Sequence, residues 1–281
     1  MITDFQCNVV YLSSRLQGLC PKTYARLILA FQKYGVEYRH LTDTNAIWCR
    51  DYMPVQMAEN VFCGFTYDPD YLHDSEELLA TRTDGNLLCR GLGFEVKQPS
   101  VPLILDGGNV IRCGHKIIMV EKVFKENGYP SDILKQAIEE HFMAELIILP
   151  WDQEEIYGHA DGLVRYIGHD RVLITNYDRF DKQFTRNIID ILQQHFTEVV
   201  KLEYNIQRQH KHNWAYINWL QTENVLLIPS FGYPEDEQAF EQITSLMPMY
   251  KECAELIDAS DLIRYEGCLN CASWTIRETR W

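Results

Sequence analysis

Short apolar runs and segments of helical periodicity alternate along the chain. Residues 7–12 form the first apolar run, and the next segment begins at Pro21 and ends at Gly35, residues that commonly mark the start and end of a helix. Between them, apolar side chains recur at intervals of three and four positions, which places them on one helical face. Residues 36–41 then alternate polar and apolar side chains as a strand does. The first part of the chain is therefore predicted to fold as strand, helix and strand.

The same order recurs four more times. The predicted elements are strands at 61–67 and 94–96 around a helix at 73–88, strands at 116–120 and 145–149 around a helix at 131–143, strands at 172–175 and 199–204 around a helix at 181–196, and strands at 225–229 and 253–257 around a helix at 236–247. Alternation alone is common to α/β proteins. Here, however, a polar segment follows each unit about every 55 residues, a spacing typical of repeat architectures. We therefore expect an α/β fold with five units around an axis, as a single domain over residues 1–281.

Composition narrows the choice of partners. The 281 residues carry 26 lysines and arginines against 40 acidic residues, a formal net charge of −14. Nucleic-acid binding needs a positive face, so that partner is disfavoured. No apolar run reaches the roughly 18 residues of a membrane span, and the N-terminus lacks the features of an export signal. Nine scattered cysteines fit a reducing compartment. These features predict a cytoplasmic protein without nucleic-acid or membrane partners.

Two of the polar segments carry residue types suited to catalysis. Cys271 lies in the fifth segment, and a thiolate is a strong nucleophile when a cation lowers its pKa. A bound guanidinium could supply that positive charge. His159 and Asp161 form a His-x-Asp pair in the third segment, and in an extended chain both would project to the same side. The histidine would then transfer protons near neutral pH while the carboxylate binds substrate. A surface loop would explain the pair equally simply.

The other segments carry candidate ligands for a planar cation. Asp51 follows Arg50 and Trp48, and carboxylates match the donors of a guanidinium while an aromatic ring stacks on it. The alternative is a structural ion pair beside a core tryptophan. Asp106, before a glycine pair, could bind substrate or fix a turn that needs close backbone approach. Asn218 could orient the substrate or form a local cap.

Together these segments resemble the agmatine deiminase and bacterial peptidyl-arginine deiminase family of guanidino-group-modifying enzymes. The resemblance is carried by Trp48-Cys49-Arg50-Asp51-Tyr52-Met53-Pro54, Leu105-Asp106-Gly107-Gly108-Asn109, His159-Ala160-Asp161, the stretches from Tyr216-Ile217-Asn218 through Pro229 and from Gly232 to Asp236, and Gly267-Cys268-Leu269-Asn270-Cys271. It covers nearly the whole chain in the family's order. It implies the pentein fold, a five-bladed α/β propeller with the site on its axis.

The resemblance also implies a reaction. Cys271 would attack the guanidinium carbon, His159 would carry protons, and Asp51 and Asp161 would grip the substrate. Further substrate-binding positions would be Trp48, Arg50, Asp106 and Asn218. Hydrolysis of an S-alkylthiouronium intermediate would release ammonia and a ureido product, with no metal or organic cofactor. The substrate would be agmatine, arginine or peptidyl-arginine, agmatine placing the enzyme in polyamine biosynthesis, and a homodimer is a further expectation.

The motifs depart from the family's pattern at three positions. Cys268 and Asn270 stand where the family often has a glycine run and a histidine before the nucleophile, and Asp106 replaces the glutamate usual in agmatine deiminases. The chain is also shorter than typical members. These departures leave arginine, a methylated arginine or a peptide open as substrates beside agmatine.

Three alternatives of other kinds also stay open. Amidinotransferases share the fold and the Cys/His pair, so amidino transfer to an amine is one. A metal or redox site is another, because Cys268 and Cys271 form a CxxC pair and His210 and His212 lie nearby in sequence. A pentein that only binds its partner, without catalysis, is the third.

Overall fold

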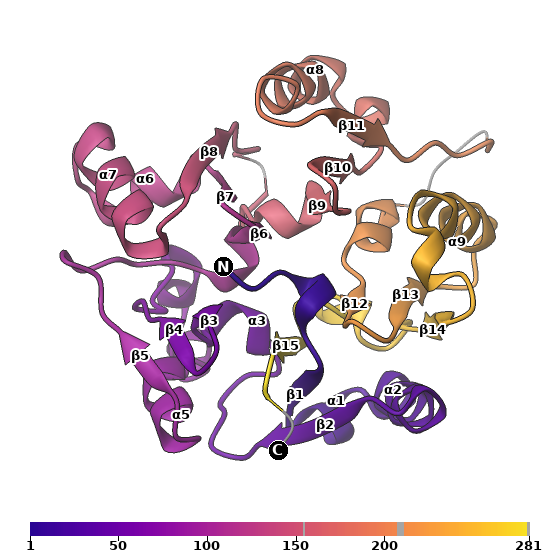
Figure 1. Ribbon diagram of the computed structural model, residues 1–281, viewed down its shortest axis with the longest axis horizontal. Helices are drawn as coiled ribbons and strands as arrows, with labels where there is room; N and C mark the ends of the chain where they lie inside the picture. The colour runs from indigo at the N-terminus through magenta and orange to yellow at the C-terminus, as the bar shows by residue number, and fades with distance from the viewer. Residues whose placement is uncertain (154, 207–210, 280–281) are drawn as a thin grey trace.

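Five three-stranded sheets stand around a central axis in the computed structural model, which describes residues 1–153, 155–206 and 211–279. Figure 1 shows the sheets as five blades, with the N-terminus close to the axis and the longer helices at the periphery. The predicted ring of five α/β units is therefore confirmed.

All five sheets have one topology. A middle strand pairs antiparallel with an inner strand and parallel with an outer strand. In the order inner, middle and outer, the strands are β3 (Val55–Ala58), β4 (Val61–Cys63) and β5 (Glu95–Lys97); β6 (Ile111–Cys113), β7 (Lys116–Val120) and β8 (Glu145–Leu149); β9 (Val164–Tyr166), β10 (Arg171–Ile174) and β11 (Glu198–Lys201); β12 (Leu220–Gln221), β13 (Leu226–Ser230) and β14 (Ala254–Asp258); and β15 (Ser273–Ile276), β1 (Val9–Ser13) and β2 (Glu37–Leu41).

Helices connect each middle strand to its outer strand. They are α1 (Leu16–Leu19) and α2 (Pro21–Tyr34), α4 (Glu76–Leu79) and α5 (Gly85–Gly91), α6 (Lys122–Asn127) and α7 (Ser131–Phe142), α8 (Lys182–Leu192), and α9 (Glu235–Leu246). Shorter turns are α3 (Cys49–Tyr52), η1 (Asp4–Gln6), η2 (Asp70–Asp74), η3 (Gly107–Asn109), η4 (Ala160–Gly162), η5 (Tyr177–Arg179), η6 (Asn213–Ile217), η7 (Pro248–Tyr250) and η8 (Ile263–Tyr265). No helix among the described residues is both long and apolar enough to cross a membrane.

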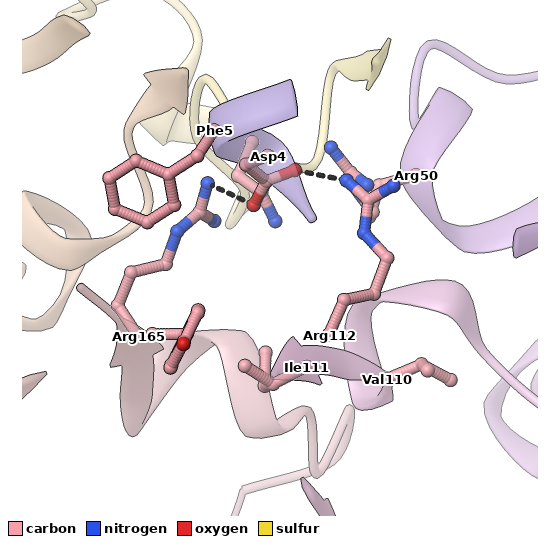
Figure 2. A pocket seen from close by; sticks show the side chains of 9 residues that line it. Asp4, Phe5, Arg50, Val110, Ile111, Arg112 and Arg165 are labelled. Atoms are coloured by element: carbon pink, nitrogen blue, oxygen red, sulfur yellow. Dashed lines mark hydrogen bonds and ion pairs between the residues drawn. The ribbon is translucent and has the colours of Figure 1, made fainter. Parts of the chain in front are cut away.

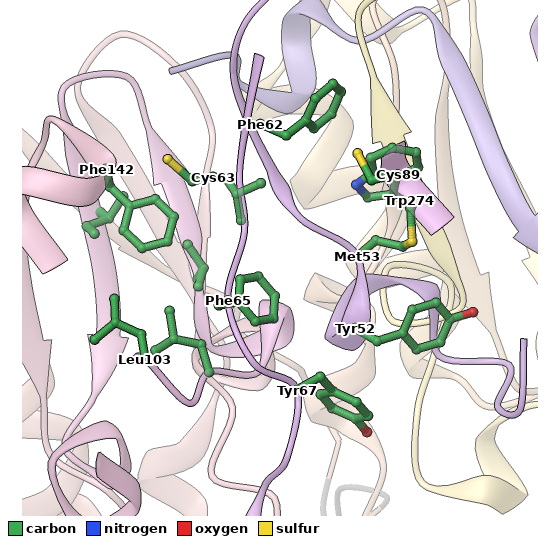
Figure 3. Close-up of a cluster of buried hydrophobic side chains, with 14 of the residues drawn as sticks. Tyr52, Met53, Phe62, Cys63, Phe65, Tyr67, Cys89, Leu103, Phe142 and Trp274 are labelled. Carbon is green, nitrogen blue, oxygen red and sulfur yellow. The ribbon is translucent and has the colours of Figure 1, made fainter. Parts of the chain in front are cut away.

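One sheet joins distant parts of the chain and closes the ring. Its middle strand β1 pairs with the inner strand β15, bringing Val9 opposite Ile276 and Leu12 opposite Ser273. Trp274 of β15 also packs its ring 5.3 Å from that of Phe62 in the neighbouring sheet. This contact belongs to a buried cluster in which rings from several blades meet (Figure 3). Ring closure is thus supported by both backbone pairing and apolar packing.

Three predicted elements end earlier than expected, one predicted helix is divided, and the inner strands are absent from the prediction. The helix predicted at 181–196 ends at Leu192. The helix predicted at 73–88 is divided, because the side chains of Ser75 and Asp84 accept backbone hydrogen bonds and each begins a new helix. The strand predicted at 61–67 ends at Cys63, whose partner Lys97 lies two residues before Pro99. The strand predicted at 199–204 likewise ends with β11 at residue 201, where its partner β10 ends.

Candidate active site

The five polar segments lie at equivalent places, each directly before an inner strand. Four form single helical turns, α3, η3, η4 and η6, and consecutive turns contact one another. The fifth segment is hydrogen-bonded to the first segment on one side and to the fourth on the other. The backbone N–H of Arg50 donates to the carbonyl of Cys271 (3.0 Å), and that of Asn270 donates to the carbonyl of Asn218 (3.0 Å). The repeat therefore gathers the polar segments around one point, as the sequence predicts.

The His-x-Asp segment reaches this point in a different conformation from the expected one. His159 is extended, with φ −95° and ψ 136°, but Asp161 lies within the 3₁₀ turn η4. The prediction of a continuous extended segment is therefore wrong. Both side chains still meet the same group of residues, because the turn follows directly after His159.

Cys271 lies between an acid and an amide. Its Sγ is 3.5 Å from Oδ2 of Asp161 and 3.3 Å from Oδ1 of Asn218. Asn270 donates from Nδ2 to the same Asp161 oxygen (2.8 Å), so the carboxylate is held from a second side. Burial and the charges of Asp161 and Asp51 raise the pKa of the thiol well above its ordinary value. Without a bound cation, Cys271 is therefore a neutral thiol.

His159 lies among the carboxylates. Its Nε2 is hydrogen-bonded to Oδ2 of Asp106 (2.8 Å), and its Nδ1 is 3.8 Å from Oδ1 of Asp51. Burial acts to lower the pKa of His159, but Asp51, Asp106 and Asp161 outweigh it and raise the pKa to about 10. The ring is therefore an imidazolium at neutral pH, with Nε2–H donating to Asp106. Burial also raises the pKa of Asp51, to about 7.

The glycine pair allows these groups to approach closely. A Cβ on Gly107 would lie 1.9 Å from the carbonyl oxygen of Arg50. On Gly108 it would lie 2.6 Å from Nδ1 of His159 and 2.7 Å from Oδ1 of Asp51. Any side chain at either position would push the segments apart, which explains the pair in physical terms.

The site carries an excess of negative charge. Among the described residues at this point, Asp51, Asp106 and Asp161 face the single imidazolium of His159. Oδ1 of Asp51 and Oδ1 of Asp106 are buried and have no hydrogen-bond partner within the described part of the chain. Unpaired buried carboxylate oxygens are costly. The arrangement therefore suits a ligand that is cationic and rich in N–H donors.

The two other predicted ligands, Trp48 and Arg50, have different surroundings. Trp48 packs against Gly267, where an added Cβ would lie 2.5 Å from its ring. Arg50 directs its guanidinium to Thr275 (Nη2 to Oγ1, 3.2 Å) and lines a cavity that also contains Asp4. Its assignment to substrate binding stays a prediction, as do the roles of the other site residues.

Several neighbours of the site carried no clear signal in the sequence. The rings of Tyr71 and Tyr157 lie 6.4 Å and 6.1 Å from that of His159, and the Tyr157 hydroxyl donates to Glu266 (3.0 Å). Tyr71 lies in η2, inside a repeat unit, and Tyr157 lies between β8 and η4. Neither belongs to one of the periodic polar segments, so the periodicity does not point to them. Asn270, by contrast, is next to Cys271 in the chain, and this adjacency is a signal that points to a partner of the nucleophile.

The geometry gives the metal alternative no support within the described residues. No group of three or more His, Cys, Asp or Glu side chains is arranged there to hold a metal ion. Cys268 is a free thiol buried in an apolar cluster. His212 forms part of the described chain, but His210 lies outside the described residues.

NMR titration should show two partly buried histidines with opposite pKa shifts. His159 should stay protonated through neutral pH, whereas burial lowers the pKa of His141 below its ordinary 6.5. Because the pKa of His159 is raised in the folded state, its contribution to stability is complete below pH 6.5 and is lost as pH rises through about 10. Asp51→Asn should lower the pKa of His159. Titration of His159 near 6.5 in the unmodified protein would contradict the described charge arrangement.

Known proteins share this architecture. A family model described as Porphyromonas-type peptidyl-arginine deiminase matches residues 8–276. A search of curated proteins finds no significant match. The solved structure of C. jejuni agmatine deiminase aligns with a TM-score of 0.72 at 17% identity, covering 98% of this chain and 94% of that one. Agmatine deiminase of Enterococcus faecalis aligns at 0.71 and 13%, covering 98% and 94%.

A more distant structure extends the likeness. DDAH from Pseudomonas aeruginosa aligns with a TM-score of 0.65 at 13% identity, covering 96% of this chain and 100% of that one. At such identities the structural likeness concerns the fold, and it confirms the predicted pentein architecture. The family match confirms the predicted enzyme family on independent grounds.

Proposed function

Because the chain belongs to the Porphyromonas-type peptidyl-arginine deiminase family, we propose that it hydrolyses a guanidinium substrate to a ureido product and ammonia, with Cys271 as the nucleophile. The observation that carries this proposal is the thiol of Cys271 beside Asp161, in a buried site with surplus carboxylate charge. A planar cation would supply both the missing positive charge and the missing hydrogen-bond donors.

Substrate binding would activate the nucleophile. The N–H groups of the guanidinium would donate to Asp51 and Asp161, whose charges raise the pKa of Cys271 in the free protein. The positive charge of the substrate would offset these carboxylates and so favour the thiolate, with the proton of the thiol released to solvent. The thiolate forms only with the substrate in place, so the nucleophile is protected from other electrophiles.

The reaction would then proceed through two proton transfers. As Cys271 attacks the guanidinium carbon, the imidazolium of His159 would donate a proton to the departing ammonia. The neutral imidazole would next take a proton from water, which attacks the thiouronium carbon and releases the thiolate. Asp106 would hold Nε2 throughout. Nδ1, which has no partner within hydrogen-bond distance among the described residues, would be the nitrogen that exchanges the proton.

A product screen tests this function and its substrate. The panel contains agmatine, arginine, methylarginines, and peptides with internal or terminal arginine, each assayed for ureido product and free ammonia. The solved relatives are agmatine deiminases, which makes agmatine the first substrate to test. We expect both products in equal amounts from at least one member. Guanidine consumption without ammonia would indicate amidino transfer, and silence across the panel would contradict the proposed hydrolysis.

Alkylation of the free thiol provides a test that needs no substrate. Iodoacetamide should label Cys271 slowly at neutral pH, because burial and the charges of Asp161 and Asp51 raise its pKa. Asp161→Asn removes one like charge and should speed labelling, although the same change weakens guanidinium binding. Peptide mass spectrometry measures the rate, with the exposed Asp132→Asn as the matched control. Equal rates in all three proteins would show that Asp161 does not act on the thiol.

A further inference from the structure

Three arginines meet in a cavity on the axis of the propeller, apart from the thiol and the carboxylates. Arg112 is the central residue of β6 and Arg165 that of β9, while Arg50 lies in α3. They are 7%, 3% and 8% exposed, respectively. Figure 2 shows Arg112 and Arg165 on opposite sides of the cavity, with Asp4 between their guanidinium groups. The propeller axis therefore gathers a second charged cluster, here of positive sign.

Asp4 neutralises part of the charge of two of these arginines. It comes from η1, near the N-terminus, and forms ion pairs with Arg112 and, at 2.9 Å, with Arg165. Thr275 donates to the same carboxylate at 3.2 Å. The proximity of these cations lowers the pKa of Asp4 below its ordinary value, against the effect of burial. Asp4 is therefore a carboxylate at neutral pH, and it carries one negative charge against three positive charges.

Arg50 is left without an acidic partner in this cluster. Its Nη2 donates to Oγ1 of Thr275 at 3.2 Å, an oxygen that also accepts from Nη2 of Arg112 at 3.2 Å. Two guanidinium groups thus share one neutral acceptor. Burial and the charge of Arg112 lower the pKa of Arg50 to about 10. Two like charges held this close in a buried site are destabilising unless an anion lies between them.

Unused donors also remain in the cluster. The Nε atoms of Arg50 and Arg165 are buried and have no hydrogen-bond partner among the described residues. Of the described residues that line the cavity, Asp4 is the one acid. The free space is small, with room for about one water-sized particle. A chloride ion is slightly larger than a water molecule, so its binding would require small shifts of the surrounding arginine side chains. That space excludes phosphate and larger oxyanions.

We propose that this axial cavity binds one small monovalent anion, chloride under ordinary salt conditions, held by the guanidinium groups of Arg50, Arg112 and Arg165. The anion would offset part of the surplus positive charge and accept the unused N–H donors. Because Arg50 is followed in the chain by Asp51, the anion would also stabilise the start of the turn that carries a site carboxylate. This inference does not depend on the reaction proposed for Cys271.

Halide-dependent melting tests the proposal. The melting temperature should rise by about 2–4 °C for each tenfold increase in sodium chloride or bromide above the dissociation constant, relative to sodium gluconate at equal ionic strength. Gluconate is too large for the cavity and controls for screening. Crystals grown in bromide should show one anomalous peak among the three guanidinium groups.

Two substitutions should change the halide effect in opposite directions. Arg50→Gln lowers the positive charge and should abolish the difference between chloride and gluconate. Asp4→Asn removes the competing carboxylate and should enlarge that difference, even though the variant is less stable in gluconate. The exposed Arg186→Gln should behave as the unmodified protein does. A halide effect of equal size in all four proteins, or bromide crystals without an axial peak, would overturn the proposal. Because the crystals are of the unmodified protein, they test the proposal even if a variant fails to fold.

Discussion

Replacing Cys271 with alanine should reduce turnover of the guanidinium substrate by roughly 10⁴-fold or more, because no other group in the site can form the covalent intermediate. The thiol lies within 3.5 Å of both Asp161 and Asn218, so its loss removes the attacking atom without moving the groups that bind the substrate. Ammonia release under saturating substrate measures the effect. Substrate binding, followed by calorimetry, should persist in the variant.

Cys268→Ala is the matched control for this experiment. Cys268 is also a buried thiol, three residues earlier, but it packs in an apolar cluster. Its replacement should leave turnover within a few-fold of the unmodified protein. Both variants should melt close to the parent temperature, since each removes a single small side chain. Substantial turnover by Cys271→Ala, or its loss only with Cys268→Ala, would refute the assignment of the nucleophile.

His159→Gln should reduce turnover by about 10²- to 10⁴-fold, the range lost with a general acid and base. The substitution removes the proton that protonates the departing ammonia, and it also removes the cation that faces Asp51 and Asp106. We therefore expect substrate binding to be retained or strengthened while the maximal rate falls. Steady-state kinetics separates the two effects, because the Michaelis constant should not rise with the loss of rate.

His141→Gln provides a control with a similar side chain in a different place. His141 is also partly buried, and its Nε2 is hydrogen-bonded to the carbonyl of Gly64 (2.8 Å), outside the site. Its loss should reduce stability but leave the rate per folded molecule unchanged. Retention of the full maximal rate by His159→Gln would show that a group other than His159 donates the proton.

The sequence predicts which polar segments meet better than it predicts the strands around them. The polar segments are recognisable because their spacing follows the repeat, and the geometry brings Asp51, Asp106, His159, Asn218 and Cys271 to one point. Each of these residues lies at the end of a unit whose longer strands and helix have clear periodicity. The repeat spacing alone therefore predicts where the polar segments meet, even where the strands of each blade are not predicted.

The inner strands escape prediction because they are too short to show a period. β12 comprises two residues and β9 three. Arg112 and Arg165 lie in such strands. In the sequence they resemble ordinary exposed polar residues, but in the closed ring both are buried. Asp4 is equally unremarkable in the sequence, since its partners lie more than 100 residues away. Contacts of this kind follow from closure of the ring and not from local pattern.

Ring closure also determines when the site can form during folding. The pairing of β1 with β15 joins residues 9–12 to residues 273–276, and Cys271 lies just before β15. Contacts so distant in sequence carry a large loop-closure entropy and form slowly. The individual blades can acquire secondary structure early, whereas the thiol meets Asp161 only when the last strand docks. Recovery of activity after dilution from denaturant therefore reports the final, rate-limiting docking of the blades, and should lag behind recovery of the far-ultraviolet circular dichroism.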